Sequence, residues 1–454
     1  MLNRREFAGA LAGAAALSAQ PPNPPRPNIL FILADDLGYG DLGCYGQRDI
    51  QTPNLDRLAA AGTRFTQAYA GSTVCAPSRG SLMTGLHTGH AFIRGNANID
   101  LPANTVTAPR ILKQAGYRTA MIGKWGLGTI RGTGTPEQQG FDDWFGYLDQ
   151  VHAHTYYPTE LWENGREVFL AGNFGPGRTD YSPDLFTRRA HRFLDHQTTA
   201  NPFFLYLAYT TPHANNERGA QTGNGMDVPS DEPYGNRNWP QVEKNFAAMV
   251  TRMDRDIGSL IDKLKARGIL DNTLIVFTSD NGPHREGGHD PDFFHSRGPL
   301  RGIKRDLYEG GIRVPAIAHW PGVVPAGVSD VPWAFWDFLP TAAELAGAPA
   351  PKITDGRSIV PALKGGAKGG AITGRDYFYW EFHENGFFQG VRQGKWKAVR
   401  YHRRSNPIEL YDLSSDAGET RNLAAQNPEI VRHMAEIMTN ARTESSEFPI
   451  KESA

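Results

Sequence analysis

Cysteine is scarce in this 454-residue sequence, and neither sign of charge predominates. The 47 Lys and Arg residues balance 48 Asp and Glu residues, so we expect no extended basic surface and no nucleic-acid partner. One of the two cysteines, Cys44, lies in a turn-rich stretch typical of a small, part-buried structural residue. If the other, Cys75, is modified, no thiol is left for an intrachain disulfide, and packing must stabilise the fold.

Long hydrophobic runs are also missing, and none is long enough to anchor the chain in a membrane. Residues 1–20 join Arg4 and Arg5 to a short Ala/Gly/Leu-rich segment, which predicts an export signal. Arg4-Arg5-Glu6-Phe7 is similar to a twin-arginine signal, and an ordinary secretory signal is the alternative. Either signal predicts a periplasmic or extracellular protein without integral membrane association.

The overall composition indicates a folded protein with many turns and long loops. The chain has 50 Gly and 32 Pro residues beside 39% hydrophobic and 11% aromatic residues, which excludes a disordered chain or a coiled coil. Its length suits one large α/β domain with a smaller appendix. We predict the large domain over residues 26–347 and, where the sequence becomes rich in Pro, Gly and Lys, a C-terminal α+β subdomain over 348–454.

Polar residues follow four predicted strands at the point where each strand ends. The strands and the residues that follow them are 28–34 with Asp35 and Asp36, 117–122 with Lys124, 203–209 with Pro212 and His213, and 273–279 with Asp280 and Asn281. In open α/β sheets, ligands bind beyond the carboxyl ends of parallel strands. We therefore expect these residues to be able to meet in one crevice, although spacing alone does not establish that they do.

Apolar periodicity predicts helices between these strands. Residues 53–61 lie between Thr52 and Gly62, and an apolar stripe over 242–264 predicts a long helix ended by Gly268. The methionines of this stripe are predicted core residues. Together the patterns predict an α/β fold with a large, mostly parallel central sheet and helices on both faces.

Three carboxylates and an amide could hold a hard dication. Asp35, Asp36, Asp280 and Asn281 offer the oxygen ligands that calcium prefers, although ligand type alone leaves magnesium open. The absence of a His pair beside these acids argues against zinc. The alternative for Asp35-Asp36 is a simple capping turn.

The run Cys75-Ala76-Pro77-Ser78-Arg79 is the most specific motif in the chain. Pro77 suits the first turn of a helix, whose free N–H groups and positive dipole end favour an anion such as sulfate. The run resembles the signature by which type I sulfatases mark a cysteine for conversion to formylglycine. Further segments similar to this family are Thr84-Gly85, Gly123-Lys124-Trp125, Pro212-His213, Ser279-Asp280-Asn281-Gly282, Leu300-Arg301-Gly302-Ile303-Lys304 and Glu309-Gly310-Gly311-Ile312-Arg313-Val314-Pro315.

The resemblance to formylglycine-dependent sulfatases runs from Asn28 to Leu413 and carries definite implications. It implies an alkaline-phosphatase-like fold and one calcium ion held by Asp35, Asp36, Asp280, Asn281 and the formylglycine derived from Cys75. A formylglycine-generating enzyme would be a maturation partner. Arg79 would brace the formylglycine hydrate, Lys124 and Lys304 would meet sulfate oxygens, and His213 would protonate the departing alcohol.

The sequence departs from this family at Gly126, where the family often has a histidine that helps to eliminate sulfate. Either a substitute base or a water in the vacated space is then required. His152 and His154 are the candidates for the base, and the alternatives for both are substrate contacts or surface polar residues. His284 and Arg94 are further candidates for the border of a substrate pocket. The remaining candidates for stacking on a sugar are Trp125, Trp144 and Trp162, although we expect a core role for each.

The function predicted from these motifs is hydrolysis of a sulfate monoester to an alcohol and sulfate. Carbohydrate sulfates are the expected substrates, and turnover of small aryl sulfates would not make them the physiological ones. A related metal-dependent phosphatase or phosphodiesterase is one alternative, but it would use Ser or Thr as nucleophile. The other alternative is a catalytically inactive, sulfatase-like glycan-binding protein.

Overall fold

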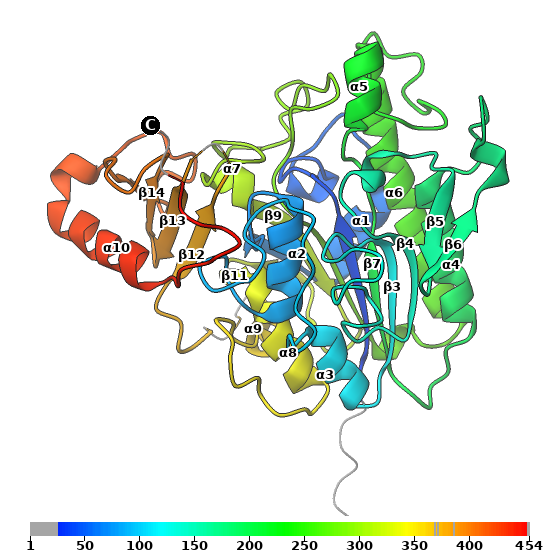
Figure 1. Cartoon of the computed structure of the whole chain (residues 1–454), viewed down its shortest axis with the longest axis horizontal. Coiled ribbons are helices and arrows are strands. Elements are labelled where there is room, and N and C mark those ends of the chain that lie inside the picture. The colour runs from blue at the N-terminus through cyan, green and yellow to red at the C-terminus, as the bar shows by residue number, and fades with distance from the viewer. Residues whose placement is uncertain (1–25, 367–368, 370–371, 385, 452–454) are drawn as a thin grey trace, which may run out of the picture.

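The computed structural model describes residues 26–451 except 367, 368, 370, 371 and 385, and the export signal predicted at 1–20 lies outside this range (Figure 1). The described residues form an 11-stranded sheet and a four-stranded sheet. No helix in this part of the chain has both the length and the apolar character needed to cross a membrane.

The large sheet is mixed but mostly parallel. Its strand order is β10-β2-β9-β8-β1-β7-β3-β4-β5-β6, with β11 also paired to β2. The five neighbours β8-β1-β7-β3-β4 are all parallel, whereas β9, β5 and β6 are antiparallel to their neighbours. The strands are β1 (Asn28–Ala34), β2 (Thr63–Tyr69), β3 (Arg118–Lys124), β4 (Asp143–Tyr147), β5 (Glu160–Glu163), β6 (Arg166–Phe169), β7 (Phe203–Ala208), β8 (Thr273–Ser279), β9 (Arg313–His319), β10 (Gly327–Ser329) and β11 (Trp333–Ala334).

Helices cover both faces of this sheet, as predicted. The helices are α1 (Pro53–Ala61), α2 (Cys75–Thr84), α3 (Ala108–Gln114), α4 (Ser182–Asp195), α5 (Asn216–Thr222), α6 (Gln241–Ala266), α7 (Glu309–Ile312), α8 (Phe338–Leu345), α9 (Val360–Gly365) and α10 (Pro428–Asn440). In Figure 1, α2, α3 and α8 lie in front of the sheet, and α1, α4 and α6 lie behind it. The alternation of β1 explains both layers, because Leu30 and Ile32 join one apolar core whereas Ile29, Phe31 and Leu33 join the other.

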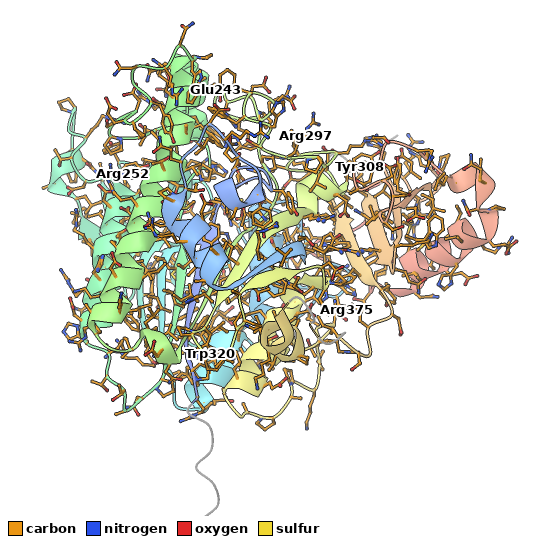
Figure 2. All side chains as sticks on the ribbon, turned by 180° about the vertical axis from the view of Figure 1, so that it is seen from behind. Glu243, Arg252, Arg297, Tyr308, Trp320 and Arg375 are labelled. Carbon is orange, nitrogen blue, oxygen red and sulfur yellow. The ribbon has the colours of Figure 1, made fainter. Side chains whose placement is uncertain are left out.

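The long helix α6 supplies much of the rear core. Its buried residues include Phe246, Met249, Met253 and Ile257, so the two methionines are core residues, as predicted. Figure 2 shows Glu243 and Arg252 along this helix, and Arg252 Nη2 lies 2.5 Å from Asp184 Oδ2 on α4. Each fully buried apolar side chain stabilises the fold by about 1.5–3 kcal/mol, so this stripe fixes α6 firmly to the sheet.

The C-terminal part is a separate antiparallel sheet with its own helix. Its strands, in order, are β12 (Phe378–Phe382), β13 (Phe388–Gln393), β14 (Trp396–Arg400) and β15 (Glu409–Asp412). The helix α10 packs on this sheet through Met434 and Met438. The division of the chain at residue 347 stays a prediction.

A buried group of charges joins the small sheet to the large one, and we call it the joint cluster: Glu309, Lys397, Glu419, Arg313 and Tyr69. Lys397 Nζ lies 3.0 Å from Glu309 Oε1 and 3.5 Å from Glu419 Oε1, and Tyr69 donates a 2.6 Å hydrogen bond to Glu309 Oε2. Figure 2 shows Tyr308, the neighbour of Glu309, between the two sheets. The charges therefore lie inside the contact between the two sheets.

Candidate active site

The polar residues at the four strand ends meet at one edge of the large sheet. They do so because β8, β1, β7 and β3 are neighbours and run in parallel, so their carboxyl ends lie together. Lys124 Nζ lies 2.6 Å from Asp35 Oδ2, and His213 Nε2 lies 3.5 Å from Asp36 Oδ2. The backbone N–H of Asp36 donates to Asp280 Oδ1 at 3.0 Å. The crevice expected from the sequence is present.

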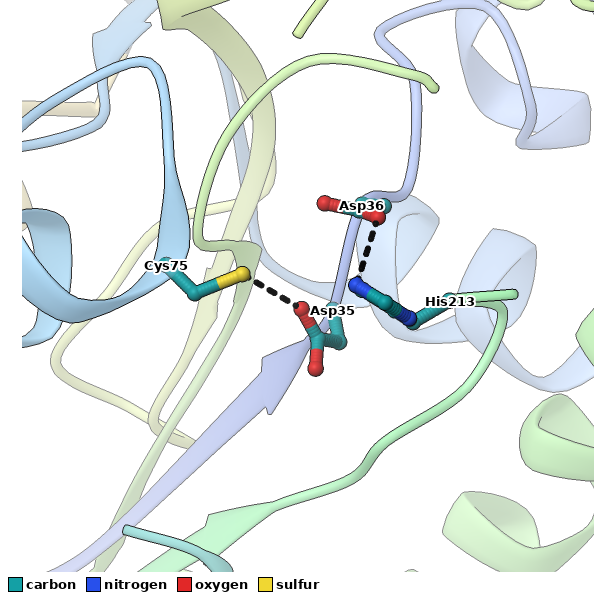
Figure 3. Close-up of side chains that lie close together, drawn as sticks. All are labelled: Asp35, Asp36, Cys75 and His213. Atoms are coloured by element: carbon teal, nitrogen blue, oxygen red, sulfur yellow. Dashed lines mark hydrogen bonds and ion pairs between the residues drawn. The ribbon is translucent and has the colours of Figure 1, made fainter. Parts of the chain in front are cut away.

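Cys75 is the first residue of α2 and points into this group of charges. Its Sγ lies 3.3 Å from Asp35 Oδ1, and Figure 3 shows Cys75 and His213 on opposite sides of Asp35 and Asp36. One turn along α2, Arg79 donates two hydrogen bonds to Asp280 Oδ2, from Nε at 3.1 Å and from Nη2 at 2.8 Å. The helix thus brings the cysteine and a buried arginine to the strand ends together.

The environment of Cys75 disfavours a thiolate. Burial, followed by the negative charge of Asp35, raises the pKa of the Cys75 thiol well above its usual value. Reactive cysteines have lowered pKa values, because the thiolate is their nucleophilic form. The unmodified thiol is therefore poorly suited to attack an ester.

A second lysine bridges the strand-end group to a carboxylate that sequence reasoning missed. Lys304 Nζ lies 2.8 Å from Asp36 Oδ2, 3.2 Å from Glu286 Oε2 and 3.1 Å from His213 Nε2. Burial alone would lower the pKa of Lys304, but the neighbouring charges of Asp36 and Glu286 raise it above its usual value. Because Nδ1 of His213 bonds the backbone oxygen of Ala214 at 2.7 Å, His213 accepts from Lys304 through Nε2.

Oxygen donors in this group suit a hard dication. Asp35, Asp36, Cys75 and His213 each place one donor atom within 4.8 Å of the others. Asn281 donates through Nδ2 to Asp36 Oδ1 at 2.7 Å, whereas its buried Oδ1 has no hydrogen-bond partner in the described chain. A buried acceptor without a donor is costly, so Oδ1 fits a cation. Asp280, which meets Asp36 directly, offers a third carboxylate.

The charge of Lys124 acts strongly on the first aspartate. Burial raises the pKa of Asp35, but the positive charges of Lys124, His213 and Arg79 outweigh this effect and hold the pKa well below its usual range. Asp35 is therefore ionised across the physiological pH range, as a metal ligand must be.

A cavity of about 250 Å³ opens beside Cys75. Lys304, His154 and His213 line it, and its other polar lining includes the side-chain amides of Asn96, Asn98, Gln150 and Asn216. Amide groups both donate and accept hydrogen bonds, so such a wall suits a ligand rich in hydroxyl groups.

Of the other predicted pocket residues, only His154 lines this cavity. Arg94 is buried with its guanidinium 2.7 Å from Glu381 Oε1, and His152 lies with Nε2 3.8 Å from Glu160 Oε1. His284 is fully buried, with a ring nitrogen within 4.8 Å of carboxylate oxygens of Asp36 and Glu286 and with Nε2 3.2 Å from the backbone oxygen of Pro212. Trp125 and Trp144 are buried core residues, as expected.

Sequence reasoning missed several residues of the site. Glu286 lies two positions beyond His284 in the same loop, so its carboxylate could have been named as a candidate from the sequence. Gln150 lies two positions before His152 and fills the space next to Gly126. Glu217, which binds His154 across 63 positions of sequence, had no local signal.

Comparisons with known proteins agree with the geometry. The Sulfatase family model matches residues 27–348, and the model described as N-sulphoglucosamine sulphohydrolase, C-terminal, matches residues 303–444. Human arylsulfatase A is 34% identical over 94% of this chain and 89% of its own length. An N-acetylgalactosamine-6-O-sulfatase from Bacteroides thetaiotaomicron is 30% identical over 93% of this chain and 94% of its own.

Solved structures are also similar to this chain over most of its length. A crystal structure of Ps i-CgsB in complex with k-i-k-neocarrahexaose has a TM-score of 0.77 and 31% identity, and it covers 94% of this chain and 95% of its own. Another, solved with its substrate D-glucosamine-2-N,6-O-disulfate, has a TM-score of 0.72 and 25% identity over 92% of this chain and 98% of its own.

Proposed function

We propose that the substrates of this chain are carbohydrate O-sulfates and that its nucleophile is a formylglycine hydrate formed from Cys75. The chain belongs to the sulfatase family and is a sulfuric ester hydrolase. The observation that carries the proposal is the position of Cys75. It begins a helix beside two lysines, an arginine and three carboxylates, and it opens onto a cavity, although its thiol is kept neutral. This setting fits a modified cysteine.

Asp35, Asp36, Asp280 and the Oδ1 of Asn281 would hold one calcium ion. When bound, calcium supplies positive charge that attracts a sulfate oxygen and favours ionisation of a neighbouring hydroxyl. Formylglycine hydrate at position 75 supplies two hydroxyls, of which one takes up sulfate and the other allows its release.

Side chains of the chain itself would hold the reacting groups. Arg79 keeps Asp280 in place through its two hydrogen bonds, and Lys124 and Lys304 offer positive charge to the sulfate oxygens. The departing alcohol needs a proton, and His213 would supply it from Nε2 after taking that proton from the Lys304 ammonium, which donates to Nε2.

The proposed substrate class is supported by the cavity wall and by similar proteins. Four side-chain amides beside Cys75 suit sugar hydroxyls. Solved structures similar to this chain contain k-i-k-neocarrahexaose or D-glucosamine-2-N,6-O-disulfate, and a relative is an N-acetylgalactosamine-6-O-sulfatase. Export from the cytoplasm, proposed from residues 1–20, would bring the enzyme to sulfated glycans outside the cell.

Two measurements on one preparation test the proposal. The protein is produced with a formylglycine-generating enzyme, the peptide containing Cys75 is analysed by mass spectrometry, and sulfate release is measured on sulfated mono- and oligosaccharides and on an aryl sulfate. We expect the aldehyde at position 75 and release from at least one saccharide, with no release by Cys75→Ala. An intact cysteine in an active preparation contradicts the nucleophile, and hydrolysis of aryl sulfate alone contradicts the substrate class.

A further inference from the structure

The space beside Gly126 is filled by another part of the chain. Gly126 has a φ of +75°, and a Cβ built on it would lie 2.0 Å from Gln150 Nε2. Gln150 is 8% exposed and donates from Nε2 to the backbone oxygen of Gly126 at 3.3 Å. A side chain at position 126 is therefore excluded by both the backbone conformation and Gln150, and any base at this wall of the cavity must come from elsewhere.

His154 reaches the same cavity from the 3₁₀ turn η2 (His152–His154), which follows Gln150. Its ring stacks on the ring of His213, with centroids 4.8 Å apart and an interplanar angle of 15°. Its Nδ1 lies 3.3 Å from Glu217 Oε1, at the start of α5. Two neighbours thus fix the ring in position and orientation.

The hydrogen bond to Glu217 determines which nitrogen of His154 is available. A carboxylate accepts, so Nδ1 carries the proton and Nε2 keeps its lone pair. Within the described chain Nε2 has no hydrogen-bond partner. Burial, followed by the positive charge of Lys124, lowers the pKa of His154, which keeps the ring neutral and ready to accept a proton.

The two histidines that line the cavity have different bonds. Nε2 of His213 accepts from Lys304 and Nδ1 bonds the backbone oxygen of Ala214, so neither nitrogen of His213 is free to take a proton from the residue at position 75. His154 has a free Nε2 and a carboxylate behind Nδ1, which is the arrangement of a general base with its orienting partner.

We propose that His154 is the catalytic base of sulfate release, with Glu217 as its positioning residue, in place of a histidine at position 126. This inference rests on the proposed function. Nε2 of His154 takes the proton of the hydroxyl that remains on side chain 75, and the electron pair of that O–H bond forms the second bond of the aldehyde carbonyl. The C–O bond to sulfate breaks, sulfate leaves with its electron pair, and His154 later passes the proton to water.

The test separates the two halves of the reaction in the full-length, matured protein. An aryl sulfate is mixed with wild type and His154→Ala, and acid-quenched samples are analysed for released phenol, for free sulfate and for the intact mass of the protein. With His154→Ala we expect one equivalent of phenol at about the wild-type rate and free sulfate slowed by about 100-fold. The protein should then carry the extra mass of one SO₃ group, a readout independent of turnover.

Matched variants support the assignment. His152→Ala removes a ring from the same turn but outside the cavity, and it should leave both phases unchanged. Glu217→Gln should accumulate the same heavier protein with a smaller slowing of sulfate release. Added imidazole should restore sulfate release to His154→Ala, because the lost ring borders an open cavity. If His154→Ala does not fold, His154→Gln replaces it in the test. It fills the same space without a base, so the same slow release of sulfate is expected.

Other outcomes overturn the proposal. Wild-type sulfate release by both His154 variants excludes His154 as the base. A slow phenol phase with no heavier protein assigns His154 to the first step instead. Failure of the proposed function is distinguished from both, because the wild-type protein would then have an intact cysteine at position 75 or release no sulfate from any saccharide.

Discussion

Two buried lysines of this chain lie between paired carboxylates, yet their surroundings differ. Lys304 lies between Asp36 and Glu286 and lines the cavity beside Cys75. Lys397 lies between Glu309 and Glu419, is 0% exposed, and its Nζ lies 5.9 Å from the centre of the Trp380 ring. The first can meet a ligand, whereas the second is enclosed between two sheets.

The difference shows how one type of charge cluster serves two purposes. In the joint cluster, the carboxylate of Glu309 accepts hydrogen bonds from Lys397, the Tyr69 hydroxyl and Arg313. The backbone N–H of Glu309 donates to Glu419 Oε2. At the active site, the buried Oδ1 of Asn281 lacks a partner in the described residues. Glu419 Oε1 of the joint cluster also lacks a hydrogen bond in the described residues, but it lies 3.5 Å from Lys397 Nζ inside a closed contact, whereas the active-site cluster borders a cavity that a ligand can enter.

The largest expected effect is that of Cys75→Ala on turnover. Loss of the proposed nucleophile should reduce sulfate release by at least about 10⁴-fold. The free energy of unfolding should change by less than about 1 kcal/mol, because little volume is lost. Turnover assays and denaturant titrations check both results, and an active Cys75→Ala variant would contradict the chemistry assigned to this cluster.

Lys397→Met and Lys304→Met test the comparison directly. Removing Lys397 leaves the buried Glu419 without its cation and Glu309 with Arg313 as its remaining ion pair, and it should lower the free energy of unfolding by about 3–5 kcal/mol. Removing Lys304 should instead slow turnover by about 10²–10³-fold and, with calcium present, affect stability less. Equal losses of stability in both variants, measured in urea with calcium, would remove the distinction between the two clusters.

Calcium should stabilise only the active-site cluster. At about 100 times its Kd, the ion should add about 2.7 kcal/mol to the free energy of unfolding. Asn281→Ala should weaken this gain because it removes the unpaired oxygen, whereas Lys397→Met should retain it. Thermal unfolding in the presence of calcium or of a chelator measures this stabilisation. An equal stabilisation of wild type and Asn281→Ala by calcium would place the ion elsewhere.

The smallest effect concerns pH at the joint cluster. Burial raises the pKa of Glu419 from 4.5 to about 7 in spite of Lys397. A raised pKa gives stability that is present below pH about 4.5 and lost as the pH rises through about 7. Wild type should therefore lose stability relative to Glu419→Gln over this range, as measured by urea titration. Parallel pH curves for the two proteins would refute the raised pKa.

Much of the fold was predictable because apolar patterns determine it. The predicted helix 53–61 is α1, and the predicted strands 28–34 and 273–279 are β1 and β8. Residues after four parallel strands meet because parallel neighbours end at one edge. The placement of Cys75 and Arg79 on one helix also agrees with the sequence pattern.

Contacts between distant loops were not predictable. The sequence offered His152 and His154 as equal candidates, and only their three-dimensional partners, Glu160 and Glu217, separate them. Arg94 follows α2 closely, but its ion pair with Glu381 of the C-terminal sheet directs it away from the cavity. Such pairings depend on side-chain geometry across the fold, which has no local signature.

The burial of α2 has a consequence for the order of events during biosynthesis. All ten residues of this helix are buried, and Cys75 is 1% exposed. Asp36 and Lys304, which meet beside it, are 268 positions apart, so the site closes only when nearly the whole large domain has been synthesised and folded. The maturation enzyme proposed for this chain would have to reach Cys75 before that closure. If Cys75 is converted to formylglycine as proposed, the time between synthesis and folding would limit the fraction of molecules that become active.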